Sequence, residues 1–103
     1  MKDSKQIAIQ NQLEEKDIYF ITHKAIIGQP DIYIPGLNLC IFADGCYWHG
    51  CQIHHPTRYQ DRFYSDFRIK HTLELEGYKV IRIWEHDINK ANFDISTYLS
   101  AIY

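Results

Sequence analysis

The residue types that could carry out chemistry gather in one part of the chain, between positions 30 and 55. Asp31 and Asp44 supply carboxylates there, and the segment 46–55 (CYWHGCQIHH) adds two cysteines and three histidines. Carboxylate oxygens suit hard cations such as Mg²⁺, whereas cysteine and histidine are the ordinary ligands of zinc. Two metal sites of different character are therefore expected close together.

The cysteines and histidines have the spacing Cys46-x4-Cys51-x2-His54, which is typical of a zinc site that still lacks a fourth ligand. His55 could bind in place of His54. The alternative is that the cysteines are reduced and pack as small hydrophobic side chains, which suits Cys40 within its apolar run.

A β-hairpin is expected to position the carboxylates. Residues 31–35 and 38–43 are short β-type runs on either side of a Pro-Gly turn. Folding this hairpin brings Asp31 opposite residues 42–44, so local geometry alone could build a site for a hard metal. The alternative is that both aspartates are plain turn residues.

The other elements are predicted from hydrophobic periodicity. Helices are expected over residues 4–16, 60–76 and 95–102, and further strands over residues 18–22 and 78–84. Phe63 and Phe67 are expected on the inner side of the middle helix. The run 38–43 is apolar on both faces, which predicts a central, doubly covered strand. The order α-β-β-β-α-β-α gives an α/β fold with a mixed sheet flanked by helices, its last strand joining in parallel.

Composition indicates one globular domain, residues 1–103, with 46% hydrophobic residues. Three cysteines cannot all pair, and no segment has the length of a membrane span, so a reduced cytosolic protein is expected. The net charge is −2, yet positive charge is unevenly spread, because no lysine or arginine lies between Lys24 and Arg58. Such a distribution permits a nucleic-acid partner and fits a solvated helix face equally well.

Residues 28–87 resemble the very-short-patch-repair (Vsr-type) DNA mismatch endonucleases of the PD-(D/E)xK nuclease superfamily. The resemblance rests on DGCYWHGC at 44–51, on Asp66, and on the segments GYKV at 77–80 and IWEH at 83–86. It implies a restriction-endonuclease-like core with a structural zinc site. It also implies Mg²⁺-dependent hydrolysis of phosphodiester bonds in duplex DNA, at G·T mismatches in DNA repair.

The resemblance also implies roles for single residues. Asp31 would bind Mg²⁺ together with either Asp44 or the backbone carbonyl of Ala43, a choice that depends on hairpin register. His49, which replaces the lysine of the wider superfamily, would be the general base, and Asp66 would support it. Asp44 departs from the mismatch enzymes, which tend to carry histidine at that position.

For zinc, the resemblance implies Cys46, Cys51 and His54 as three ligands and His86 as the fourth. Tyr47 and Trp48 match aromatic residues that wedge between base pairs at the mismatch, where unstacking costs least. Arg58 and Arg62 are predicted to contact the DNA.

Two other functions stay open. The first is a zinc-stapled nucleic-acid-binding module that has lost catalysis, which the net acidity and the short segment before Asp31 favour. The second is a nuclease for another nucleic-acid structure.

Overall fold

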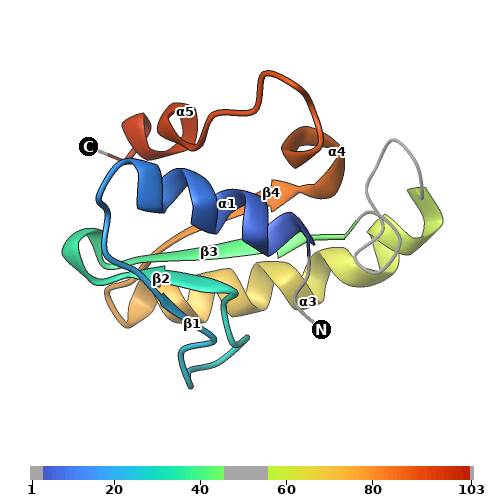
Figure 1. Ribbon diagram of the computed structural model, residues 1–103. Coiled ribbons are helices and arrows are strands. Elements are labelled where there is room, and N and C mark those ends of the chain that lie inside the picture. Colours follow the sequence, from blue (N-terminus) through green and yellow to red (C-terminus); the bar gives the residue numbers. More distant parts are fainter. Residues whose placement is uncertain (1–3, 46–55, 103) are drawn as a thin grey trace.

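A computed structural model of the chain describes residues 4–45 and 56–102, without the side chains of residues 56–61 (Figure 1). The described helices are α1 (Ser4–Glu15), α3 (Pro56–Leu75), α4 (Glu85–Ile88) and α5 (Ile95–Ser100). The strands are β1 (Ile21–Thr22), β2 (Ile32–Ile34), β3 (Leu39–Asp44) and β4 (Lys79–Trp84), and a 3-10 turn, η1 (Pro35–Leu37), joins β2 to β3.

The four described strands form one mixed sheet in the order β1-β2-β3-β4. β1, β2 and β3 pair antiparallel, and β4 pairs with β3 in parallel. The predicted hairpin and the predicted parallel strand are therefore confirmed. Asn38 closes the hairpin in the left-handed region (φ 51°), which asparagine tolerates, and its side chain accepts a hydrogen bond from the Tyr33 hydroxyl at 2.6 Å.

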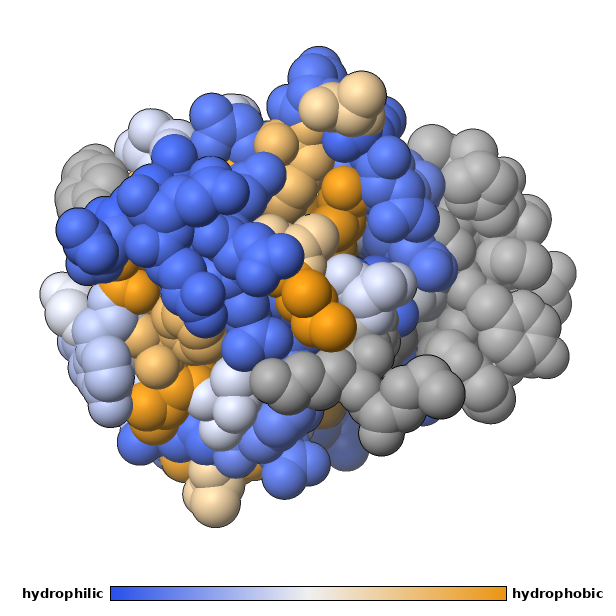
Figure 2. Space-filling view, in the orientation of Figure 1, coloured by the Kyte–Doolittle hydropathy of each residue, from blue (hydrophilic) through white to orange (hydrophobic). Residues whose placement is uncertain are grey.

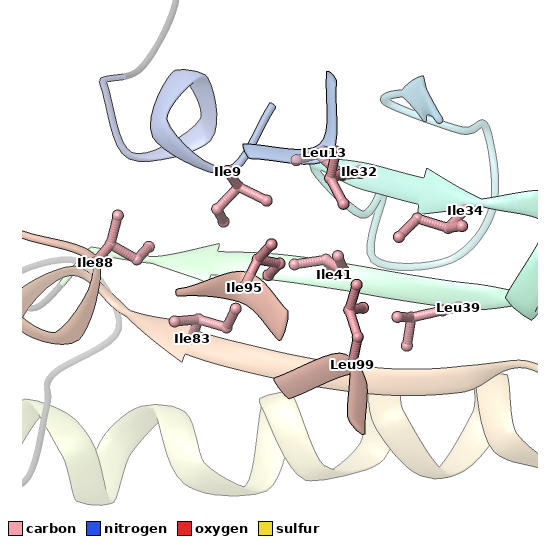
Figure 3. Packing of buried hydrophobic residues seen from close by; sticks show 10 residues of the cluster. All are labelled: Ile9, Leu13, Ile32, Ile34, Leu39, Ile41, Ile83, Ile88, Ile95 and Leu99. Carbon is pink, nitrogen blue, oxygen red and sulfur yellow. The ribbon is translucent and has the colours of Figure 1, made fainter. Parts of the chain in front are cut away.

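Helices cover both faces of the sheet. Figure 1 shows α3 along one face and α1, α4 and α5 on the other. The larger core fills the second face, and its side chains come from every element there (Figure 3): Ile9, Leu13, Ile32, Ile34, Leu39, Ile41, Ile83, Ile88, Ile95 and Leu99. β3 is paired on both edges and buried on both faces, as its continuous apolar sequence predicted.

The face of the sheet under α3 holds a smaller core of Tyr33, Cys40, Phe42, Leu73 and Val80. Cys40 is completely buried, and burial raises the pKa of its thiol to about 11. It therefore packs as a small neutral hydrophobe, as predicted.

Besides hydrophobic packing, the side-chain amide of Gln12 links α1 to the start of α5. Gln12 donates from Nε2 to the Phe93 carbonyl at 2.8 Å and accepts from the Ile95 amide at 2.6 Å. Asp94 caps α5 as an N-cap residue should, accepting from the Ser96 amide at 2.9 Å, and this bond lowers the pKa of its carboxyl. Hydrophilic residues cover the outer side of α1 (Figure 2).

The sequence prediction for the middle helix was wrong in two respects. α3 begins at Pro56 rather than at residue 60, with proline at the first helical position, where its missing N–H costs nothing. Phe63 and Phe67 were predicted to face inward, but they are 44% and 58% exposed. The more buried residues of α3 are Asp66, Ile69 and Leu73, which recur every three or four positions and so form the face of the helix that packs on the sheet. Phe67 lies off this face and is exposed.

Two further elements differ from the sequence prediction. The four-residue helix α4, directly after β4, was not predicted. The first strand, predicted over residues 18–22, is confined to Ile21–Thr22. Within the described part of the chain, the helices are too short or too polar to cross a membrane.

We expect Ile41→Ala to lower the free energy of unfolding by about 2–5 kcal/mol, because it leaves a cavity in the middle of the central strand. The measurement is urea unfolding. The matched control is Leu75→Ala, at a side chain that is 75% exposed, where the change should stay within about 0.5 kcal/mol. Equal unfolding midpoints for the two variants would contradict this account of the core.

Candidate functional site

Asp31 lies directly before β2, after the buried Pro30. Its Oδ2 accepts a hydrogen bond from the Ala43 amide at 2.8 Å. The register of the hairpin, in which Ile32 pairs with Ile41, accounts for this contact, because it sets Asp31 beside the last residues of β3. The juxtaposition of Asp31 with residues 42–44 was predicted, and it is present.

Asp44 ends β3 and is only 2% exposed, which is rare for a carboxylate unless a partner compensates its charge. Both of its oxygens accept hydrogen bonds from Nη1 of Arg82, at 3.0 and 3.1 Å. Arg82 comes from β4 and pairs in the parallel register with Phe42, so that its guanidinium also lies 4.3 Å from the centre of the Phe42 ring.

Asp66 reaches the same guanidinium from α3, with its Oδ1 3.7 Å from Nη2 of Arg82. The side chains of Asp44, Asp66 and Arg82 are 3%, 15% and 18% exposed, so three charged groups from three elements meet in a poorly solvated place. We call this set the acid–arginine cluster. Its formal charge is negative, because two carboxylates share one guanidinium.

Arg82 was not predicted as a site residue. The available signal was the parallel pairing of the last strand with the central one, because this pairing brings cations of β4 close to Asp44, the carboxylate of β3. The offset of this pairing, Leu39 opposite Lys79, decides which cation arrives, and periodicity alone does not give it.

Many predicted site residues fall outside the described residues: Cys46, Tyr47, Trp48, His49, Cys51, His54 and the alternative His55. Arg58 lies in α3 at a position whose side chain is not described, and Arg62 is exposed on the same helix. Within residues 4–45 and 56–102 no group of three or more cysteine, histidine or acidic side chains could hold a metal ion. Three of the four predicted zinc ligands lie outside those ranges, so this finding does not test the zinc prediction.

His86, the predicted fourth zinc ligand, is the second residue of α4. Its ring lies nearly parallel to that of Trp84, at 8° with 6.3 Å between centres, and its Nε2 is 3.7 Å from an Asp87 carboxylate oxygen. β3 and β4 pair in parallel as far as Asp44 and Trp84. The chain therefore enters the segment 46–55 from the same edge of the sheet at which His86 stands.

A hollow of about 250 Å³ lies between α3 and the ends of β3 and β4. The acid–arginine cluster forms part of its lining, together with three aromatic side chains and one lysine: Phe63, Phe67, Trp84 and Lys70.

Comparison with known proteins points to nucleases. Residues 13–55 match the family described as DNA mismatch endonuclease Vsr. The chain is also similar to three Type II nicking enzymes. These are V.NaeI of Lentzea aerocolonigenes (28% identical over 69 residues), V.XorIIP of Xanthomonas oryzae pv. oryzae (29% over 94) and V.NmeAIP of Neisseria meningitidis (34% over 80).

The aligned regions cover 57%, 80% and 66% of this chain, but only 42%, 69% and 57% of those relatives. The chain thus spans between about two fifths and two thirds of their length. Among solved structures, the catalytic domain of the homing endonuclease I-Bth0305I superposes with a TM-score of 0.65, covering 98% of this chain and 91% of that one. The sequence identity of this pair is 24%, so the likeness concerns the fold alone.

We expect Arg82→Met to lower the free energy of unfolding by about 3–5 kcal/mol, because it removes the cation that compensates the buried Asp44. Lys90→Met is the matched control. It breaks the 3.0 Å pair with Asp87, in which the lysine side chain is 60% exposed, and should cost at most about 1 kcal/mol.

Urea unfolding of both variants, and of a double-mutant cycle with Asp44→Asn, separates the ion pair from the packing of Arg82 over Phe42. A coupling energy near zero between Arg82 and Asp44 would show that packing, rather than charge, holds the arginine.

Proposed function

We propose that this chain, which is similar to the DNA mismatch endonuclease Vsr family and to Type II nicking enzymes, is a DNA endonuclease that hydrolyses phosphodiester bonds with the help of Mg²⁺. The relatives are named as nicking enzymes, which supports cleavage of a single strand. The observation that carries the proposal is the contact between the Asp31 carboxylate and the Ala43 amide, beside the acid–arginine cluster.

The donor atoms at this place suit a hard cation. Asp31 offers a carboxylate, and the backbone of the adjacent Ala43 offers a carbonyl oxygen; Mg²⁺ needs only one or two such protein ligands and keeps several waters. Both oxygens of Asp44 accept from Arg82, which supports the Ala43 carbonyl rather than Asp44 as the second ligand. Bound Mg²⁺ would polarise the phosphate and lower the pKa of a water molecule.

The proposed proton acceptor is His49, whose neutral imidazole can take a proton from the attacking water. Asp66 would hold that imidazole and stabilise its protonated form. Arg82 lies 3.7 Å from Asp66, so the arginine would fix the direction of this carboxylate. In this scheme Arg82 is a positioning residue.

We propose that a structural zinc ion is bound by Cys46, Cys51, His54 and His86, with His55 as the alternative to His54. The parallel ends of β3 and β4 support this set, because the chain enters the segment 46–55 from the same edge of the sheet at which His86 stands. Metal-ligand bonds between them would tie the loop to β4 and add their free energy to folding.

The proposed substrate is duplex DNA with a G·T mismatch, at which Tyr47 and Trp48 would enter the base stack. Arg58 and Arg62 would contact the phosphates. Arg62 is exposed on α3, which agrees with this role.

We expect Asp31→Asn to slow cleavage at least roughly 10²-fold, because several kcal/mol of charge stabilisation at the phosphate depend on the metal ligand. The fold should survive, since the asparagine oxygen can still accept from the Ala43 amide. The control is Asp17→Asn, an exposed aspartate with φ 55°, a conformation that asparagine also tolerates.

The assay follows single-turnover nicking of labelled duplexes, fully matched or with one G·T pair, with and without Mg²⁺. Full activity of Asp31→Asn would place the metal elsewhere. A wild-type chain that binds both duplexes but cuts neither, with any divalent metal, would instead support the binding-module alternative.

A second prediction concerns zinc. Protein purified without added zinc should contain about one zinc atom per chain, and Cys51→Ala should lose both the metal and much of the stability. Cys40→Ala is the matched control. Cys40 is buried in the core under α3, so this variant should keep its zinc. Metal analysis by mass spectrometry decides the matter, and equal zinc content in both variants would rule out the proposed ligands.

A further inference from the structure

A row of stacked rings runs along an exposed side of α3, next to the hollow. The ring centres of Phe63 and Phe67 are 6.2 Å apart with an angle of 18°, and those of Phe67 and His71 are 6.1 Å apart with an angle of 3°. Phe63 and Phe67 are nevertheless 44% and 58% exposed. Large exposed apolar groups that adjoin a hollow mark interaction sites more often than they mark plain surface.

The hollow beside this row has the size and walls of a site for one small planar group. Phe63 and Phe67 line it from α3, and Trp84 lines it from the end of β4. Its volume of about 250 Å³ is below the range of roughly 300–1,000 Å³ that is usual for pockets that hold drug-sized ligands. Aromatic side chains bind nucleobases by stacking, whatever the base, because every base has a π-face.

The charges of the hollow favour a neutral ring over a phosphate. Among the described lining residues, two cations, Lys70 and Arg82, balance the two carboxylates of Asp44 and Asp66, so their formal charges cancel. Arg82 is already held by the carboxylates, so among the described lining residues the exposed Lys70 is the cation that can bind a phosphate at the rim.

We propose that this hollow binds one unstacked nucleobase of a DNA strand against Phe67 and Trp84, with Lys70 on the phosphate of that nucleotide. The residues of this site are not those of the wedge proposed for Tyr47 and Trp48. The inference rests on the proposed function only in taking DNA as the ligand, since base binding needs no cleavage.

The test uses a short single-stranded oligonucleotide with a central 2-aminopurine, whose fluorescence is quenched on stacking, without added divalent metal. Wild type should quench the probe, and Phe67→Ala should bind it roughly 5- to 150-fold more weakly. Phe67→Trp should restore binding, whereas Phe67→Leu, which keeps the apolar bulk and protects the fold, should not. Tyr19→Ala, at a tyrosine that is 71% exposed, is the matched control and should behave as wild type.

One further measurement concerns the phosphate. Lys70→Gln should weaken binding and reduce the slope of log affinity against log salt by about one unit.

Cleavage of the G·T duplex is measured on the same variants, so that a failure of the base site can be distinguished from a failure of the proposed endonuclease activity. Quenching that depends on Phe67, without any cleavage, keeps the base site and removes the endonuclease. Cleavage by wild type with unaltered probe binding by Phe67→Ala removes the base site alone. Absence of quenching by wild type overturns the base site whether or not the protein cuts DNA.

Discussion

The pairing of Arg82 with Asp44 is the interaction on which the site depends. A carboxylate that is 2% exposed at the end of a central strand is costly to bury, and the guanidinium of the neighbouring strand makes that position tolerable. Because the same guanidinium lies near Asp66, one arginine links β3, β4 and α3. The direction of the carboxylates is thus coupled to the packing of the helix over the sheet.

Much of the fold could be predicted because its signals are local. The continuous apolar run of β3 indicates burial on both faces, and the Pro-Gly turn before Asn38 sets the hairpin that carries Asp31 to the amide of Ala43. A parallel last strand follows from the crossover helix. These features depend on residues close together in the chain or on general rules of chain topology.

What could not be predicted depends on long-range register. The approach of Arg82 to Asp44 follows from an offset between β3 and β4 that neither strand encodes alone. Phe67 was assigned to the core because aromatic residues on an amphipathic helix usually lie there, yet Ile69 and Leu73 fix the inner face and Asp66 takes the next position on it. On this helix a carboxylate is therefore more buried than the neighbouring aromatic ring. Hydrophobic packing alone would favour the opposite arrangement, whereas a functional site accounts for it.

The arginine also bears on the choice between Asp44 and the Ala43 carbonyl as a metal ligand. A guanidinium cannot lose its proton in a protein, so Asp44 could bind a metal only by sharing its oxygens with a permanent cation. Asp31 and a neutral carbonyl carry less negative charge than two carboxylates, so a Mg²⁺ ion bound by them would keep more of its charge to act on a phosphate. The contact between Arg82 and Asp44 would thus have two effects. It would stabilise the buried carboxylate, and it would keep Asp44 from binding the metal, whose ligands would then be Asp31 and the Ala43 carbonyl.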